Sequence, residues 1–187
     1  MGYGDRSHMI LLIQTCQHHL HYYEFVKPIE DILKKEKIAY LSVHYSTIST
    51  EMLQNAQKII ICGTSLKDEK FIQDINYFQW IKTIEKPILG ICAGMHILGL
   101  IYEGQLQKQK EIGLQYIFFK KEFLGMKKEK QVYVLHKYVI NSNQFNIYAV
   151  SQSCHQAIKH KTKPFYGVLF HPEVRNKELI IEFIHTS

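Results

Sequence analysis

The sequence is poor in the features that mark secreted, membrane and zinc-ribbon proteins. Its 187 residues include four cysteines, which are scattered and form no CxxC pair, so neither a disulfide framework nor a zinc knuckle is indicated. Reduced thiols in the cytoplasm fit this usage better. No stretch approaches the roughly 18 apolar residues of a membrane span, and no signal peptide is recognisable. We therefore expect a cytoplasmic protein without a membrane partner.

Linkers rich in Gly, Pro or Ser, internal repeats and low-complexity segments are also missing, so one domain accounts for the chain. The first nine residues, MGYGDRSHM, are typical of an expression-tag remnant, with Met9 as the native start. The expected domain is residues 10–187. Hydrophobic residues make up 46% of the sequence, which is enough to build a core.

Positive charge is in excess but is not concentrated. The formal net charge is +6, and the densest lysine group, KKEFLGMKKEKQ at 120–131, is interleaved with glutamates. This pattern favours a solvated loop or edge strand, with a docking face for a more acidic protein as the alternative. Binding of nucleic acid would rest on net charge alone, so we do not expect it.

Strand-like and helix-like runs alternate through the first half of the chain. The strand candidates are 9–15, 38–45, 58–63 and 87–92. The helix candidates are 23–37, 51–56, 74–85 and 93–102. From about residue 112 the runs become β-branched or aromatic, at 113–121, 131–140, 145–151 and 165–171, before a final amphipathic helix at 176–185. This order predicts an α/β fold, with a mostly parallel central sheet, helices on both faces and antiparallel additions in the C-terminal half.

Cys92 lies where an apolar strand candidate, PILGIC, passes into a helix candidate. Chemistry in open parallel sheets gathers at the carboxyl ends of strands, and a sharp strand-to-helix turn exposes a nucleophile there. Gly90 and Gly94 leave room for such a turn. The N-terminus of the following helix would stabilise a thiolate. A small buried hydrophobe is the alternative role for this cysteine.

A candidate general base for Cys92 lies near the C-terminus, in FYGVLFHPEV. His171 falls where a strand candidate stops, and Glu173, two residues on, lies on the same side of an extended chain. The carboxylate can hold the imidazole in one tautomer. With Cys92 these residues predict a Cys–His–Glu triad.

The pair of motifs GICAGMH and YGVLFHPEV resembles class I glutamine amidotransferases, the triad glutaminases. The similarity is greatest to the glutaminase subunit of GMP synthetase and to anthranilate synthase component II, and it extends from Met9 to the C-terminus. KIIICGTS resembles the glycine-rich oxyanion strand of the family, EGQL the end of its nucleophile helix, and VLHKYV and AVSQSCHQAIKH two of its later segments. The resemblance implies a flavodoxin-like fold of this family.

The resemblance also implies a reaction. Cys92 would attack the side-chain amide of glutamine, and His171, oriented by Glu173, would protonate the departing ammonia and then activate water on a γ-glutamyl thioester. The N–H groups of Ala93 and of the Gly63–Thr64 loop would hold the oxyanion. Ammonia would pass to a separate synthetase subunit, GMP synthetase being the leading candidate. No cofactor and no metal is implied.

Two positions depart from the family pattern. His96 stands where the family usually has a glutamine that, with Gly94 beside it, helps to seat the substrate, and histidine is shorter and can carry charge. Thr64 stands in a Gly-Gly-Pro segment, and a β-branched residue disfavours positive φ, so the oxyanion site could be incomplete until a synthetase docks. These departures leave two alternatives: a hydrolase of other γ-glutamyl compounds, or a non-catalytic homologue that regulates a partner.

The remaining candidates carry less weight. A group after the first strand could share a metal, but a polar rim of the cleft is the preferred interpretation; its members are Cys16, His18, His19 and His21. We expect His136 and His155 to be rim or structural residues, and Cys62 and Cys154 to be buried and inert.

Overall fold

The computed structural model describes residues 9–186, so the expected tag remnant lies outside the described residues except for Met9. The parallel half contains β1 (Ile10–Gln14), α1 (His19–Phe25), α2 (Lys27–Lys35), β2 (Tyr40–His44), α3 (Thr50–Asn55), β3 (Lys58–Ile61), α4 (Lys70–Gln73), β4 (Ile88–Ile91) and α5 (Ala93–Ile101). Short 3₁₀ helices at Tyr45–Thr47 and Ile75–Lys82 complete it. The second half contains β5 (Gln105–Phe123), β6 (Met126–Asn141), β7 (Phe145–Val150), β8 (His155–His160), β9 (Phe165–Val168) and α6 (Glu178–His185).

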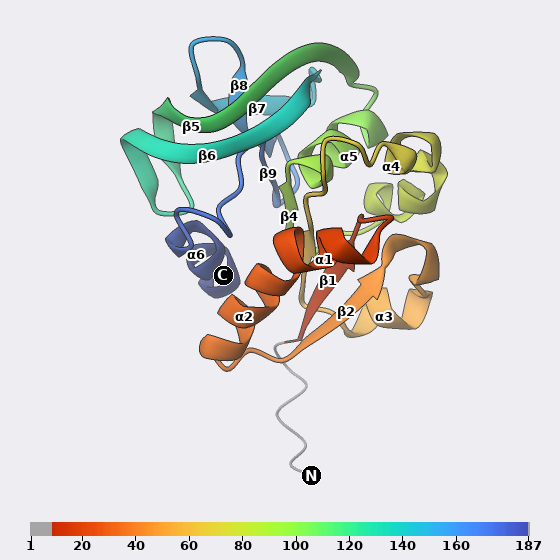
Figure 1. Ribbon diagram of the computed structural model, residues 1–187. Helices are drawn as coiled ribbons and strands as arrows, with labels where there is room; N and C mark the ends of the chain where they lie inside the picture. Colours follow the sequence, from red (N-terminus) through yellow and green to blue (C-terminus); the bar gives the residue numbers. More distant parts are fainter. Residues whose placement is uncertain (1–8, 187) are drawn as a thin grey trace.

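The nine strands within residues 9–186 join one sheet in the order β2-β1-β3-β4-β9-β8-β7-β5-β6 (Figure 1). The pairs from β2 to β9 are parallel, and those from β9 to β6 are antiparallel. The predicted α/β fold, parallel first and antiparallel later, is therefore confirmed. β9, from the second half, pairs with β4, so the chain end carrying His171 lies beside the strand that leads to Cys92.

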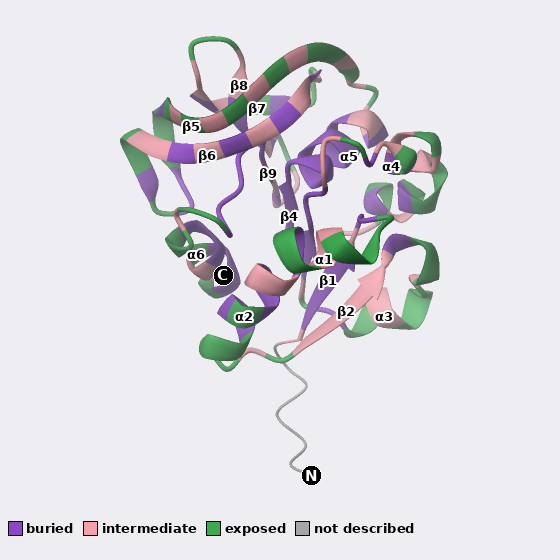
Figure 2. Ribbon diagram, in the orientation of Figure 1, coloured by how far each residue is buried: buried purple, intermediate pink, exposed green. Residues whose placement is uncertain are grey.

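The central strands are buried on both faces, as Figure 2 shows for β1 and β4. Successive side chains of β1 point to opposite faces, so Leu12 joins the core beneath α1, α2 and α6, while Leu11 joins the core beneath α3 and α5. Continuous Ile and Leu runs are what a parallel sheet covered by helices requires. The expectation of helices on both faces is met for the same reason.

Two predicted elements differ in detail, and one strand was not predicted. The helix expected at 23–37 is two helices that begin at His19 and meet at Val26, with Pro28 in the first turn of α2. The helix expected at 74–85 is a 3₁₀ helix preceded by the short α4. β8 was not predicted, because its sequence, HQAIKH, has a single β-branched residue, Ile158, and none of the Phe and Tyr residues that identified its neighbours.

β5 and β6 form a long curved hairpin that arches over the rest of the sheet (Figure 1). The turn has two residues, Leu124 and Gly125, with φ of 46° and 73°, which is the conformation that matches the twist of a hairpin. β6 is the last strand in the sheet order, so the lysine-rich segment 120–131 is hairpin and edge strand, as expected. Charged side chains on an edge oppose pairing with another sheet.

No helix within residues 9–186 is long and apolar enough to span a membrane.

Candidate active site

Cys92 occupies a sharp turn between β4 and α5. Its φ of 48° and ψ of −100° lie in a region that a non-glycine residue rarely adopts. The turn brings Gly90 against Gly94, where a Cβ on Gly90 would lie 2.5 Å from the Gly94 carbonyl. A Cβ on Gly94 would lie 2.3 Å from the carbonyl oxygen of Ile61. Gly94 thus permits close packing of α5 on β3. Gly94 is not among the residues that line the cavity described below, and its role in seating the substrate stays a prediction.

His171 and Glu173 form a buried pair. The distance from His171 Nδ1 to Glu173 Oε1 is 2.7 Å, and both side chains are shielded from solvent. The His171 backbone N–H donates to the carbonyl of Tyr133 on β6 at 2.8 Å, which fixes the segment after β9 against the hairpin. The carboxylate therefore holds the imidazole in one orientation, with Nδ1 as the donor and Nε2 on the far side of the ring.

Burial opposes protonation of His171, but the charges of Glu173 and Cys92 outweigh it and raise the pKa of His171 well above its usual value. A protonated imidazole is the form in which His171 can act as a general acid.

The side chains of Cys92 and His171 converge on Gly63. A Cβ built at Gly63 would lie 2.8 Å from His171 Cε1 and 3.3 Å from Cys92 Cβ, so only glycine fits between them and the sheet. The Cys92 thiol itself donates to the carbonyl of Leu135 at 3.5 Å, and His171 Nε2 has no hydrogen-bond partner among residues 9–186. The thiol would therefore have to rotate away from Leu135 to face Nε2. Cys92 is also buried, so the expectation of an exposed elbow was wrong: the β6 segment covers it.

The backbone amides expected to hold an oxyanion belong to the residue after Cys92 and to the Gly63–Thr64 loop, where a Cβ on Gly63 would lie 3.3 Å from Cys92 Cβ. Ala93 is the first residue of α5, and the Gly63–Thr64 loop follows β3. Within the described part of the chain, the N–H groups of Gly63, Thr64 and Ala93 donate to no other group, so each is free for a ligand. Thr64 does not have a positive φ, so the strain that its β-branch would cause there does not arise.

The Thr64 side chain fixes the position of this residue through a hydrogen bond. Its hydroxyl donates to Asp68 Oδ2 at 2.7 Å, and the same oxygen lies 2.6 Å from His21 Nδ1 on α1. Asp68 Oδ1 is buried and has no partner among the described residues. Burial opposes ionisation of Asp68, but hydrogen bonds from Thr64, His21 and the Gln17 amide outweigh it and lower the pKa of this carboxyl. Sequence reasoning missed Asp68, which only its place in the loop after Thr64 could have suggested.

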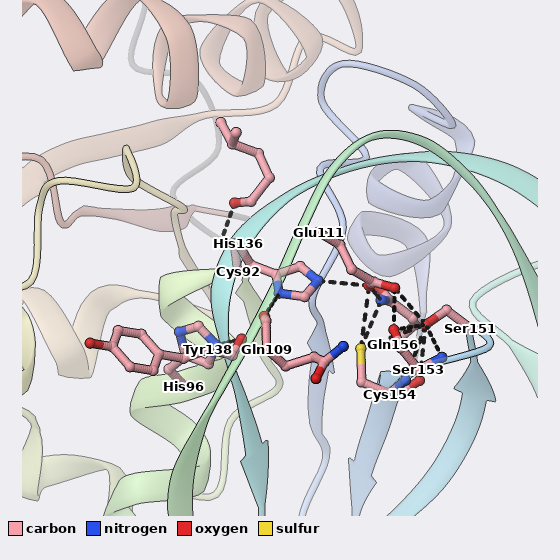
Figure 3. Close-up of polar contacts among 11 residues, drawn as sticks. Cys92, His96, Gln109, Glu111, His136, Tyr138, Ser151, Ser153, Cys154 and Gln156 are labelled. Carbon is pink, nitrogen blue, oxygen red and sulfur yellow. Dashed lines mark hydrogen bonds and ion pairs between the residues drawn. The ribbon is translucent and has the colours of Figure 1, made fainter.

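His96 projects from α5 into the same region. Its ring is buried, and Nε2 is 3.0 Å from the carbonyl of Tyr138 (Figure 3). The ring also lies parallel to that of Phe71. Burial lowers the pKa of His96 to about 4. The residue is therefore a neutral donor at neutral pH, and the charge that its replacement of glutamine could have introduced is absent.

A cavity connects these groups. It is bordered by Cys92, Ala93 and His96 on one side and by the β6 segment 135–138 on the other, with Thr64, Asp68 and Glu69 closing the end. It offers about 30 Å³ to the centres of water molecules, which is room for a few waters only. Movement of this wall would enlarge the space beside Cys92. Lys137 and Tyr138, both missed from the sequence, form that wall.

The other sequence candidates fall elsewhere. Cys16 is buried and His21 binds Asp68, while His18 and His19 are exposed, so the four residues do not form a common ligand set. Cys62 is buried as predicted, but Cys154 is only half-buried, so that part of the expectation was wrong. His136 is fully buried, whereas His155 is half-buried.

Comparison with known proteins identifies the family. The model of the family "Glutamine amidotransferase class-I" matches residues 20–186. The chain belongs to this family. The resemblance expressed by GICAGMH and YGVLFHPEV is thereby confirmed.

Relatives within the family agree with this placement. A glutamine-hydrolyzing GMP synthase subunit of Methanocaldococcus jannaschii is 39% identical over 100 residues, which cover 49% of this chain and 53% of that protein. The glutamine-hydrolyzing GMP synthase of Staphylococcus saprophyticus is 31% identical over 156 residues, or 77% of this chain and 30% of that protein. The chain thus matches about half the length, or less, of these curated relatives.

Solved structures show the same fold. A Thermoplasma acidophilum protein assigned provisionally as a GMP synthase subunit superposes with a TM-score of 0.83 at 22% identity, covering 94% of this chain and 92% of that one. A glutamine amidotransferase from Thermotoga maritima gives a TM-score of 0.70 at 18% identity, covering 95% and 81%.

Proposed function

We propose that this chain hydrolyses glutamine to glutamate and ammonia through a triad of Cys92, His171 and Glu173. The observation that carries the proposal is the strained elbow at Cys92, which directs its side chain to Gly63, where it meets an imidazole hydrogen-bonded to a buried carboxylate. That combination has no structural advantage, since a buried ionisable trio costs stability unless it serves chemistry.

The proposed reaction has two steps, formation of a thioester on Cys92 and its hydrolysis, and His171 transfers one proton in each. The Cys92 thiolate attacks the amide carbon, and the carbonyl oxygen takes the electron pair and is held by the N–H groups of Ala93 and of Gly63 or Thr64. His171 then gives its Nε2 proton to the leaving nitrogen, so ammonia departs and a γ-glutamyl thioester remains. Water next loses a proton to Nε2 and attacks the thioester, which releases glutamate and restores the thiolate. Glu173 stays ionised throughout and holds the His171 imidazole in the orientation that points Nε2 away from the carboxylate.

We further propose that the ammonia passes to a synthetase subunit in trans. Curated relatives such as that of Methanocaldococcus jannaschii are named as one subunit of a GMP synthase, which supports GMP synthetase as the acceptor enzyme. Two findings support low activity of the free chain. The cavity beside Cys92 admits only a few waters, and its wall is a segment of the β5–β6 hairpin. A hundredfold activation on docking needs about 2.7 kcal/mol of differential binding to the open state.

The test is steady-state release of ammonia from glutamine by the purified chain, alone and with a GMP synthetase subunit, with Cys92→Ala as the inactive control. We expect slow turnover alone and at least a tenfold gain with the partner. Turnover near about 10 per second without a partner would refute conditional activation. Hydrolysis of other γ-glutamyl compounds but not of glutamine would instead indicate the alternative hydrolase, and no turnover with any partner would indicate a regulatory homologue.

A further inference from the structure

A second cluster of Cys, His and Glu lies apart from the triad, between the hairpin and the turn before β8. One ligand-type atom from each of Glu111, His136 and Cys154 lies within 4.8 Å of the others. Figure 3 shows Glu111 at the centre of this cluster, with contacts to His136 on one side and to Cys154 on the other. His136 is fully buried, and the other two residues are half-buried.

Three separate elements supply these residues. Glu111 on β5 and His136 on β6 are directly opposite each other, so their side chains emerge on one face of the hairpin. Cys154 precedes β8. An ion bound here would connect the hairpin to the β7–β8 pair.

The environment of His136 fixes its tautomer. Its Nδ1 is 3.1 Å from the carbonyl oxygen of Gln109, an atom that can only accept, so Nδ1 carries the proton. In the neutral ring, Nε2 then presents a lone pair, and it faces Glu111 Oε2 at 3.0 Å. Two acceptors at this distance repel each other unless a cation lies between them. A ring nitrogen freed for coordination by a carbonyl on the other nitrogen is the usual arrangement of a metal-binding histidine.

We propose that Glu111 Oε2, His136 Nε2 and Cys154 Sγ bind one divalent transition-metal ion of the Zn²⁺ type. Zinc bond lengths in a tetrahedron place O and N ligands about 3.3 Å apart and O and S ligands about 3.6 Å apart. The corresponding separations here are 3.0 Å from Oε2 to Nε2 and 3.4 Å from Oε2 to Sγ. These two separations are within a few tenths of an ångström of the zinc values, and Nε2 and Sγ lie within 4.8 Å of each other, so the three atoms can share one ion with the fourth position left to solvent.

The surrounding groups orient these ligands. The hydroxyls of Ser151 and Ser153 donate to Glu111 Oε1, which leaves Oε2 as the ligand oxygen. The Gln156 amide is 2.7 Å from that Oε2 and 3.2 Å from the sulfur. Gln156 is fully buried, and its Oε1 has no partner among the described residues, so it is available to a metal-bound water. A mixed N, O and S donor set suits Zn²⁺ and its analogue Co²⁺ better than Mg²⁺ or Ca²⁺.

The position of the cluster gives the ion a consequence for the candidate active site. Leu135 and Lys137 flank His136 and line the cavity beside Cys92. Fixing the His136 ring would therefore fix this wall of the cavity. The metal site itself does not depend on glutaminase activity, so each proposal can fail without the other.

The test is metal binding by the Cys92→Ala chain, in which the triad sulfur cannot be a ligand. We expect one equivalent of Zn²⁺ to remain after dialysis, and Co²⁺ to give the absorption band of a thiolate–cobalt bond. Cys154→Ser in this background should weaken Zn²⁺ binding at least tenfold and abolish the band, and Glu111→Gln should weaken binding with the band retained. Cys16→Ser is the matched control and should leave both unchanged.

Two results would overturn the proposal. The absence of stoichiometric Zn²⁺ and of the Co²⁺ band from the folded Cys92→Ala chain would mean that a proton, not a metal, joins His136 to Glu111. A band that survives Cys154→Ser but is lost in Cys16→Ser would assign the metal to the N-terminal histidine group. The Co²⁺ band in the parent Cys92→Ala chain requires no substitution within the cluster, so a folding defect in Cys154→Ser does not remove the test.

Discussion

His96 should make the protein unusually sensitive to mild acid. Burial holds the pKa of this histidine at about 4, whereas an unfolded histidine titrates near 6.5. Between these values the unfolded chain binds a proton that the folded chain does not, so stability is lost as pH falls from about 6.5 toward 4. Linkage with these two pKa values gives a loss of about 2 kcal/mol at pH 5 relative to pH 7 from this single residue.

The substitution His96→Gln isolates the effect. The glutamine amide can still donate to the Tyr138 carbonyl, which accepts from His96 Nε2 at 3.0 Å, but it cannot titrate. Urea unfolding of both proteins at pH 7 and pH 5 gives the comparison, and with a slope of about 2 kcal/mol/M the wild type should lose about 1 M more in its midpoint. Other buried histidines, including the neighbouring His136, are present in both proteins, so most of their contribution cancels.

His19→Gln is the matched control, since this side chain is exposed on α1 and should leave the pH dependence as in the wild type. Equal midpoint shifts for wild type and His96→Gln would refute the reasoning, because a proton would then enter the folded site without penalty. A smaller Michaelis constant for glutamine in His96→Gln would show in addition that this position seats the substrate.

Three further outcomes are expected. Glu173→Gln should lower the rate of ammonia release less than His171→Ala, because it removes the orienting charge but keeps the proton carrier, and equal rates for His171→Ala and active wild type would exclude the triad. Gly90→Ala should lower the free energy of unfolding, measured in urea, by about 1–3 kcal/mol, since the new Cβ would lie 2.5 Å from the Gly94 carbonyl. An unchanged urea midpoint would contradict that packing. Lys58→Met should lower the free energy of unfolding by about 1 kcal/mol, because the ammonium donates to carbonyls at the end of α6, at 2.7 and 2.9 Å in two cases. An unchanged free energy of unfolding would mean that water replaces the ammonium.

The features that could be predicted are those that depend on short stretches of sequence. The alternation of Ile and Leu runs with amphipathic segments gave the parallel half, because a sheet covered on both faces needs continuous apolar strands. The elbow was predictable from Gly90 and Gly94, two residues either side of Cys92. His171 and Glu173 are also close in sequence, so their contact needs only an extended backbone.

The break between α1 and α2 shows where local reasoning fails. Pro28 falls within the helix expected at 23–37, but the helix containing Tyr22 already ends at Val26, whose N–H donates to the Tyr22 carbonyl. Pro28 cannot offer an N–H to the turn before it, so it begins a new helix at no cost in hydrogen bonds. The helix start at His19 was hidden because HLHYYEF has no clear apolar stripe and no N-cap side chain.

The cluster around Glu111 could not be predicted from the sequence for a different reason. Its composition depends on one register shift in the long β5–β6 pairing. β5 and β6 pair Lys108 with Tyr138, and a regular antiparallel register would continue to Lys110 opposite His136. The register shifts between Lys108 and Glu111, so that Glu111 faces His136 instead. A one-residue shift exchanges the faces of a strand, and here it replaces an ammonium by a carboxylate beside a buried imidazole. The shift also accompanies the contact of the Gln109 carbonyl with His136 Nδ1, so the same bulge that supplies the carboxylate frees Nε2 to bind a cation.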